Sequence, residues 1–178
     1  MTMIDFADNF FDLFGLPPRY RVDEQSLERA YRALQSQVHP DRFAGGTDAE
    51  RRAALQSSAR VNEAYRALKD PVLRAEHVLS LQGIEALAET DTSLPLDFLE
   101  QQLERREAAD EAAAAGDVRA LSALVDAIAS EARDREALLA AALDDAHAYA
   151  DARTQVRELT FLHKLAADVG AMQDALDD

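Results

Sequence analysis

The sequence predicts an all-α protein with two helical parts. Its 178 residues include only six Gly and five Pro, whereas the strong helix formers Ala, Leu, Glu, Arg and Gln are abundant. Apolar residues recur at the i, i+3, i+4, i+7 spacing of an amphipathic helix, and no useful stretch alternates with the period of two that is typical of a strand. The segment 84–94 lacks a sustained apolar stripe and is expected to link a part at 1–83 to a part at 95–178.

The first part is expected to open with a short helix and a longer amphipathic one. The short helix lies around Phe10 to Phe14, because Gly15 and the Pro17-Pro18 pair prevent its continuation. Asp23 is a suitable N-cap for the second helix. The apolar face of this second helix consists of Leu27, Ala30, Tyr31, Leu34 and Val38.

Two further helices of the first part have recognisable ends. Pro40 disfavours helical backbone at the preceding residue and ends the second helix. Thr47 and Glu50 form a T-x-x-E capping box that opens a third helix, running to about Leu68. One side of that helix carries Leu55, Ser58, Val61, Tyr65 and Leu68. The Asp70-Pro71 pair and a C-terminal Gly83 predict a fourth helix over 71–82.

The second part, 95–178, is expected to be a three-helix bundle. Pro95 begins a helix that runs to Ala115 and ends at Gly116. The apolar stripe of the long helix that follows is Leu121, Leu124, Ile128, Leu139 and Leu143. That of the last helix is Val156, Leu159, Leu162, Ala166, Val169 and Met172. Three amphipathic helices with short connections can cover one another's apolar faces.

Charge and composition exclude several classes of function. The chain has 19 Lys and Arg against 34 Asp and Glu, a net charge of −15, which argues against nucleic-acid binding. It has no cysteine, which excludes disulfides, thiolate catalysis and cysteine-ligated metal or iron–sulfur clusters. None of its four histidines lies in a metal-site or catalytic motif, and no phosphate-binding loop occurs. The sequence therefore predicts no enzyme, no cofactor and no metal site.

The sequence also predicts a cytoplasmic protein that does not enter a membrane. No apolar run approaches the roughly 20 residues that span a bilayer. The first residues carry Asp5, Asp8 and Asp12 and no Lys or Arg before Arg19, unlike a secretory or mitochondrial leader.

The segment QVHPDRF, residues 37–43, lies at the tip of the hairpin expected between the second and third helices. A simple interpretation is a helix stop in which Asp41 accepts local backbone hydrogen bonds. The third helix, however, ends in VNEAYRALKDP, residues 61–71, and this combination resembles the J-domain. The resemblance implies an antiparallel helical hairpin that binds a DnaK-class chaperone and triggers its ATP hydrolysis. The implied contact residues are His39, Pro40, Asp41, Arg29, Arg32 and Arg42.

The resemblance extends along the chain to the HscB family of co-chaperones. It is carried by LFGLPPRYRVDEQSLERAYRALQ (13–35), DPVLRAEHVLSLQG (70–83) and FLEQQLERREAADE (98–111). It implies a J-domain at 1–83 and a C-terminal bundle that binds the iron–sulfur scaffold IscU and delivers it to the chaperone HscA. The chain lacks the N-terminal tetracysteine module of longer eukaryotic relatives, which resembles the bacterial form.

The J-domain part departs from the common pattern at several positions. Val38 stands where a Tyr usually precedes the His, and Arg42 stands where Lys is commoner. The residues at 35–37 are Gln, Ser and Gln in place of possible bases, so the basic face is reduced to Arg29, Arg32 and Arg42. Chaperone affinity is therefore expected to depend less on charge than in general J-proteins.

In the bundle, the resemblance places the scaffold-binding surface on Leu99, Leu103, Glu104, Glu107 and Phe161. Glu100 stands at the edge of this surface, where some relatives have an apolar residue. Periodicity alone equally allows Leu99 and Leu103 to be bundle core. Phe161 lies about 100° around the helix from Leu162, off the main stripe, where a large aromatic is often exposed.

Three alternatives to an HscA and IscU adaptor remain open from the residues. One is a J-protein that serves a general DnaK with another client. The second is a helical binding module in which the His-Pro-Asp loop is only structural. The third is a metal-dependent enzyme, for which the sequence offers no ligand set.

Overall fold

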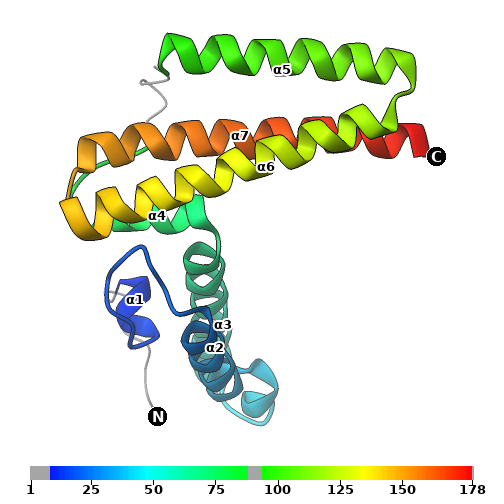
Figure 1. Ribbon diagram of the computed structural model, residues 1–178. Coiled ribbons are helices and arrows are strands. Elements are labelled where there is room, and N and C mark those ends of the chain that lie inside the picture. The colour runs from blue at the N-terminus through cyan, green and yellow to red at the C-terminus, as the bar shows by residue number, and fades with distance from the viewer. Residues whose placement is uncertain (1–8, 88–93, 178) are drawn as a thin grey trace. The chain divides into compact units, whose positions relative to one another are not determined.

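The computed structural model describes residues 9–87 and 94–177, which form helices and connecting loops with no strand. They group into two compact units that divide between Leu81 and Gln82 (Figure 1). No helix in the described part is long and apolar enough to cross a bilayer. The all-α class predicted from the sequence is confirmed.

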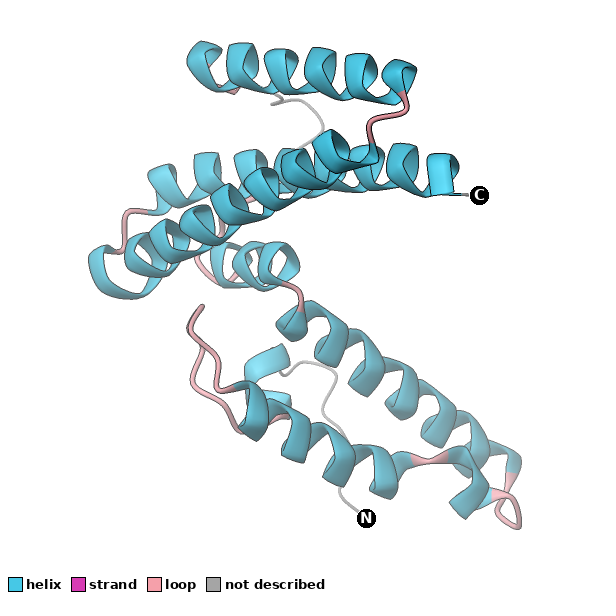
Figure 2. Ribbon diagram, turned by 45° about the vertical axis from the view of Figure 1, so that its right-hand side comes forward, coloured by secondary structure: helices cyan, strands magenta, loops and turns pink. Residues whose placement is uncertain are grey.

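The first unit is a helical hairpin with two short helices packed beside it. The hairpin consists of α2 (Glu24–Val38) and α3 (Asp48–Lys69), which run antiparallel and are joined by a loop at one end (Figure 2). Helix α1 (Phe10–Leu13) and helix α4 (Pro71–Ser80) both pack on α3. Fully buried apolar side chains from all four helices form the core, among them Phe11, Leu27, Val61, Leu68 and Leu79.

The predicted helix caps of this unit are confirmed. The Asp23 carboxylate accepts from the backbone N–H of Gln25, and Thr47 and Glu50 form a complete capping box. Asp70 caps α4, accepting from the backbone N–H groups of Val72 and Leu73 at 2.9 Å, with Pro71 in the first helical position. Helix α4 ends at Ser80, two residues earlier than the predicted end at 82.

The predicted apolar side of α3 is wrong at one position. Leu55 has 62% of its surface exposed, whereas its neighbour Ala54 is buried. The buried side of α3 runs through Ala54, Ser58, Val61, Ala64, Ala67 and Leu68. Val38, which replaces the usual Tyr, is buried as expected.

The second unit is the predicted three-helix bundle. Helices α5 (Leu96–Ala115), α6 (Val118–Ala140) and α7 (Tyr149–Asp177) are successively antiparallel (Figure 1). Helices α6 and α7 pack against each other along most of their length, and α5 packs less extensively on both. The core includes Leu121, Ile128, Leu139, Leu143, Val156, Leu159, Leu162 and Val169. The expected core residues Leu124, Ala166 and Met172 are only half-buried.

The turn between α6 and α7 was not located from the sequence. A π-helix, η2 (Ala141–Ala146), continues α6, and His147 then adopts a left-handed conformation with φ of 51°. The ring Nδ1 of His147 lies 3.0 Å from the carbonyl oxygen of Leu143. Since neither Gly nor Pro lies between Asp117 and Val169, the usual turn signals are missing.

Part of the expected linker at 84–94 packs on the bundle. The carbonyl oxygen of Glu85 accepts from Arg153 Nε at 2.9 Å, and that of Ala86 accepts from Arg157 Nε at 3.1 Å. Ala86 is buried. Residues 88–93 of the expected linker lie outside the described residues.

Candidate functional site

The His-Pro-Asp loop is formed by the end of α2 and a single 3-10 turn, η1 (Pro40–Phe43). His39 has φ of −59° and ψ of 129°, the extended backbone that a following proline favours. The turn is closed by hydrogen bonds from the backbone N–H of Arg42 to the His39 carbonyl (3.1 Å) and from that of Ala44 to the Asp41 carbonyl (3.3 Å). The loop therefore has a defined local structure.

Within the loop, His39 supplies the local cap that the simple interpretation assigned to Asp41. The His39 Nδ1 accepts from the backbone N–H of Asp41 at 3.3 Å and lies 3.6 Å from the Asp41 Oδ2. The Asp41 side chain is 89% exposed, and that of His39 is about half exposed at 53%. A neutral imidazole with its proton on Nε2 fits this geometry, and it leaves the Nε2 N–H and the carboxylate open to a partner.

Two arginines brace the loop from either side. Arg42 Nη1 donates to the carbonyl oxygen of Ser36 at 3.0 Å, so it caps the last turn of α2. Arg51 Nη1 donates to the carbonyl oxygens of Ala44 and Gly46. Arg51 was missed by sequence reasoning, and no signal marked it, because its role depends on the folded path of the loop.

The arginines of the basic face predicted on α2 are exposed. Their positive charge is partly neutralised by acidic residues at the N-cap and in the first turns of the same helix. Arg29 lies 3.9 Å from the carboxylate of Asp23, and Arg32 Nε donates to Glu28 at 2.8 Å. Both arginine side chains are well exposed. These acidic partners were not predicted from the sequence, and the pairing lowers the net positive charge of the face.

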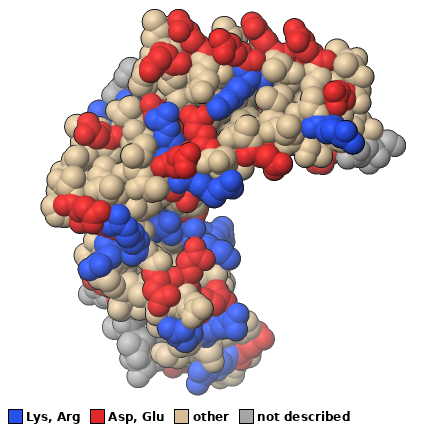
Figure 3. Space-filling view, in the orientation of Figure 1, with Lys and Arg blue, Asp and Glu red and all other residues tan. Residues whose placement is uncertain are grey.

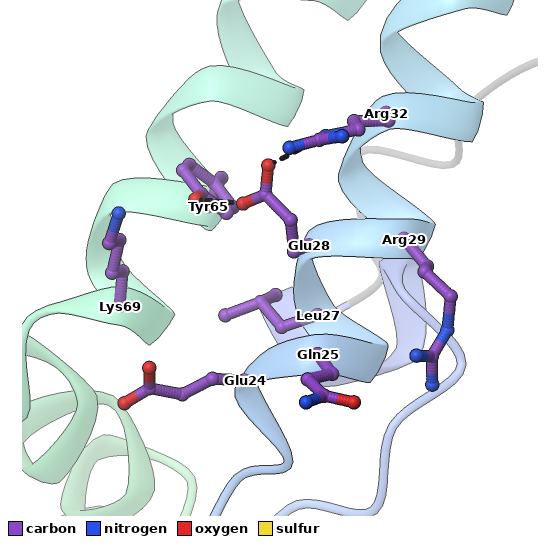
Figure 4. Close-up of a pocket in the computed structure, with 8 residues that line it drawn as sticks. All are labelled: Glu24, Gln25, Leu27, Glu28, Arg29, Arg32, Tyr65 and Lys69. Carbon is purple, nitrogen blue, oxygen red and sulfur yellow. Dashed lines mark hydrogen bonds and ion pairs between the residues drawn. The ribbon is translucent and has the colours of Figure 1, made fainter.

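A cleft of about 390 Å³ lies between α2 and α3 next to this face (Figure 4). Figure 4 shows Glu28 at its centre, bonded to the Arg32 guanidinium and to the Tyr65 hydroxyl. The hydrogen bond from Tyr65 and then the contact with Arg32 hold the pKa of Glu28 below its ordinary value. The same bond raises the pKa of Tyr65. The lining residues are Glu24, Gln25, Leu27, Glu28, Arg29, Arg32, Tyr65 and Lys69.

Tyr31 of α2 and Tyr65 of α3, the latter a lining residue of the cleft, join the two helices of the hairpin. Their rings stack with centroids 4.0 Å apart and an interplanar angle of 18°. The Asn62 Oδ1 accepts from the Tyr31 hydroxyl at 3.0 Å and from Gln35 Nε2 at 2.8 Å. Polar contacts thus fix the separation of α2 and α3 near the predicted chaperone-binding face.

On the bundle, α5 presents an exposed apolar row. Leu99 is 39% exposed and Leu103 is 59% exposed, so the alternative that both are bundle core is wrong. Leu96, one turn earlier, is also exposed and was missed, although the i, i+3, i+7 spacing of the three leucines is visible in the sequence.

Phe161 of α7 is half-exposed, as its position off the apolar stripe predicted, with 36% of its surface accessible. Its ring contacts the buried ring of Phe98 edge to face, with centroids 5.8 Å apart and an interplanar angle of 81°. The contact joins α7 to the first turn of α5, the helix that also carries the exposed leucines.

The outer side of α5 is acidic. Glu100, Glu104 and Glu107 are exposed, and Figure 3 shows acidic side chains gathered along the edge of the molecule that α5 forms. The two arginines of α5 do not offset this charge, because Arg105 pairs with Glu131 and Arg106 with Asp168 on the other helices. Because the sequence resemblance predicts client binding here, we call Leu99, Leu103 and Phe161, with Glu104 and Glu107 at the rim, the client patch.

Across residues 9–87 and 94–177, no three His, Asp or Glu side chains converge as a metal site would require. The predicted site residues lie on two separate surfaces. The His-Pro-Asp loop and the arginines of α2 belong to the first unit, and the client patch belongs to the second.

Comparison with protein-family models assigns each unit. The model of the DnaJ domain matches residues 9–77, and the model described as the HSCB C-terminal oligomerisation domain matches residues 94–170. These two matches lie within the two compact units seen in the structure.

Curated relatives and solved structures agree with this assignment. The co-chaperone protein HscB homolog of Burkholderia multivorans is 46% identical over 98% of this chain and 99% of its own length. The structure of chaperone HscB from Vibrio cholerae has a TM-score of 0.83 at 38% identity and covers 95% of this chain and 99% of that one. The crystal structure of human co-chaperone protein HscB shares the fold, with a TM-score of 0.87 at 24% identity, over 94% of this chain and 83% of that one.

Proposed function

The chain belongs to the HscB family of J-domain co-chaperones, and from this premise we propose that it is a non-enzymatic adaptor in iron–sulfur cluster assembly. It binds an IscU-like scaffold through the client patch of its bundle and delivers the scaffold to an HscA-like chaperone of the DnaK class. Its His-Pro-Asp loop stimulates the ATPase of that chaperone. The ATP chemistry takes place in the partner, so this chain needs neither a catalytic residue nor a cofactor.

The observation that carries the proposal is the exposure of the client patch. Large apolar side chains are normally buried, and an apolar cluster with a charged rim is typical of a protein-binding surface. The exposure of Leu99, Leu103 and Phe161 supports such a cluster in the proposal, and the acidic rim suits a partner surface with basic residues. A bundle that only braced the J-domain would not require these side chains at its surface.

The first unit supports the chaperone half of the proposal. His39 and Asp41 stand exposed on a loop that Arg42 and Arg51 hold from both sides, so a partner meets a preformed surface. Preorganisation lowers the entropy lost on binding. The proposed chaperone contact combines this loop with the exposed Arg29 and Arg32.

A reconstituted ATPase assay tests the proposal. The purified chain is added to an HscA-type chaperone and, separately, to a general DnaK, each with and without an IscU-type scaffold. We expect stimulation of the HscA-type ATPase that increases further when the scaffold is present. Equal stimulation of DnaK, with no scaffold binding in calorimetry, would instead establish a general J-protein with another client. We also propose that the protein is cytoplasmic, which cell fractionation tests.

A further inference from the structure

Four buried or half-buried charged side chains lie between the helices of the bundle. They are Arg105 from α5, Glu131 and Arg135 from α6, and Glu158 from α7, and we call them the charge network. Arg105 Nη2 lies 2.6 Å from Glu131 Oε2, and Arg135 Nη2 lies 3.3 Å from Glu131 Oε1. Arg135 also pairs with Glu158, so the network joins all three helices.

Burying these charges carries a cost that apolar residues would avoid. Glu158 is only 3% exposed, and burial raises its pKa even though Arg135 acts in the opposite direction. Buried ion pairs add little net stability compared with well-packed apolar side chains, but their hydrogen bonds require one arrangement of the chains. The charge network is therefore better suited to fixing the position of the helices than to strengthening the bundle.

Helix α5 depends on such polar contacts for its position, because few large apolar side chains of this helix are buried against α6 and α7. Its buried residues are Phe98, Gln102, Ala109 and Ala112, of which only Phe98 is a large apolar side chain. Gln102, buried to 2%, accepts from Arg105 Nη1 at 3.0 Å and so extends the polar layer. Small alanines permit a helix to slide or turn on its neighbours, whereas directional polar contacts do not.

Arg135 connects the charge network to the aromatic pair. Its guanidinium carbon lies 5.5 Å from the centroid of the Phe98 ring, within cation–π range. On its other sides Arg135 contacts Glu131 and Glu158 and donates to Gln155 Oε1 at 3.4 Å. Phe98 in turn holds the edge-to-face contact with Phe161. A continuous chain of contacts thus leads from the buried carboxylate of Glu158 and the half-buried one of Glu131 to the exposed aromatic of the client patch.

We propose that Arg135 is a positioning residue for client binding: stacked on Phe98 and anchored by Glu131 and Glu158, it fixes Phe161 of α7 relative to Leu99 and Leu103 of α5. The patch draws its residues from two helices, so its shape depends on how those helices are offset. This inference rests on the proposed binding of a scaffold by the client patch.

Arg135→Lys is the variant that separates stacking from charge. A lysine retains a cation near Glu131 and Glu158 but lacks the planar guanidinium that stacks on Phe98 and bonds two carboxylates. The matched control is Arg133→Lys, because Arg133 lies on the same helix and is exposed. We expect Arg135→Lys to weaken binding of a purified IscU-type scaffold about tenfold in calorimetry, and Arg133→Lys to bind like the wild type.

A double-mutant cycle with Phe161→Ala shows whether Arg135 acts through the aromatic pair. If it does, Arg135→Lys causes no further loss of binding once Phe161 has been truncated. The inference is overturned if Arg135→Lys binds like the wild type, or if its loss adds in full to that of Phe161→Ala. Normal binding by Phe161→Ala itself would contradict the proposed client patch.

A measurement without any client tests the positioning separately. In NMR spectra of the free protein, the Phe161 ring resonances should shift in Arg135→Lys and remain in place in Arg133→Lys. Unchanged Phe161 resonances in Arg135→Lys would overturn the inference whatever the client proves to be.

Discussion

The imidazole Nε2 of His77 accepts a hydrogen bond from the backbone N–H of Phe10 at 3.1 Å, across 67 positions of the sequence. The ring also stacks on those of Phe10 and Phe11, with centroids 4.4 and 5.5 Å away. His77 of α4 therefore holds α1 in place, and only its neutral form can accept this bond.

The stability of the first unit should consequently fall as the pH is lowered. Burial, with a smaller contribution from Arg60, lowers the pKa of His77 below its usual 6.5. The unfolded chain then binds the proton more readily than the folded one, so this contribution is present above about pH 6.5 and is lost as the pH falls through the lower folded value. The pocket beside His77 is also lined by Glu63, Arg66 and Glu76. Burial and then the charge of Asp70 raise the pKa of Glu76, so Glu76 acts in the opposite direction to His77 as the pH falls.

Thermal melts between pH 7.5 and 5 check this dependence. His77→Gln preserves a hydrogen-bond acceptor but has no titrating ring. The wild type should therefore melt at a higher temperature than the variant near pH 7.5, and this difference should shrink as the pH falls. His163→Gln, a half-buried histidine of the bundle, serves as the control and should retain the wild-type dependence. A constant difference between wild type and His77→Gln would contradict the assignment.

His39→Gln or Asp41→Asn should abolish stimulation of the chaperone ATPase. Both side chains are exposed, so the free energy of unfolding should change by no more than about 1 kcal/mol, including the loss of the His39 cap. Steady-state ATPase assays and melting curves test the two halves of this prediction. Normal stimulation by either variant, or loss of fold in both, would refute it.

Charge reversal of Arg29 and Arg32 should weaken chaperone binding only moderately. Exposed contacts contribute about 1 kcal/mol or less each, and here Asp23 and Glu28 already compensate the arginines. Added salt should weaken the wild-type complex in the same direction, because exposed charges are screened. Calorimetry at two ionic strengths tests this, with Arg133→Glu as the control. An affinity independent of salt would count against an electrostatic contribution.

Leu103→Ala should impair scaffold binding without unfolding the bundle. At 59% exposure, Leu103 contributes little to the core, so we expect a stability change within about 0.5 kcal/mol and a loss of binding of about tenfold. Leu138→Ala, at an exposed leucine of α6, is the matched control and should affect neither quantity. Equal binding by the two variants would remove Leu103 from the client patch.

The corrected face of α3 also makes a measurable prediction. Leu68 is fully buried and Leu55 is 62% exposed, so Leu68→Ala should destabilise the protein by about 2–5 kcal/mol and Leu55→Ala by less than about 0.5 kcal/mol. Urea unfolding of the two variants provides the comparison. A similar loss of unfolding free energy in the two variants would show that Leu55 also belongs to the core.

Local signals in the sequence predicted much of this structure. Helix caps act on backbone groups within a few residues, so their positions in the sequence alone define where helices begin. This holds for Asp23, for the Thr47–Glu50 box and for Asp70-Pro71. The exposure of Phe161 was likewise predictable from its angle around α7.

Features that depend on distant neighbours were not predictable. The choice between Ala54 and Leu55 as the buried residue of α3 depends on the elements that pack against this helix, and residue type alone does not indicate it. The left-handed turn at His147 has no Gly or Pro to mark it. The pairing of Arg135 with Glu158 joins residues 23 positions apart, and the sequence shows only two charged residues on amphipathic helices.

The stacked tyrosines between α2 and α3 give the protein an intrinsic optical probe. The chain has no tryptophan and only four tyrosines, so no indole emission hides the phenol signal. Tyr31 and Tyr65 lie close enough for their electronic transitions to couple, and Tyr65 also donates a hydrogen bond to a carboxylate, a contact that quenches phenol fluorescence. Opening of the hairpin should therefore brighten the emission and reduce the near-ultraviolet circular dichroism. Unfolding of the chaperone-binding unit can thus be followed in the intact, unlabelled chain.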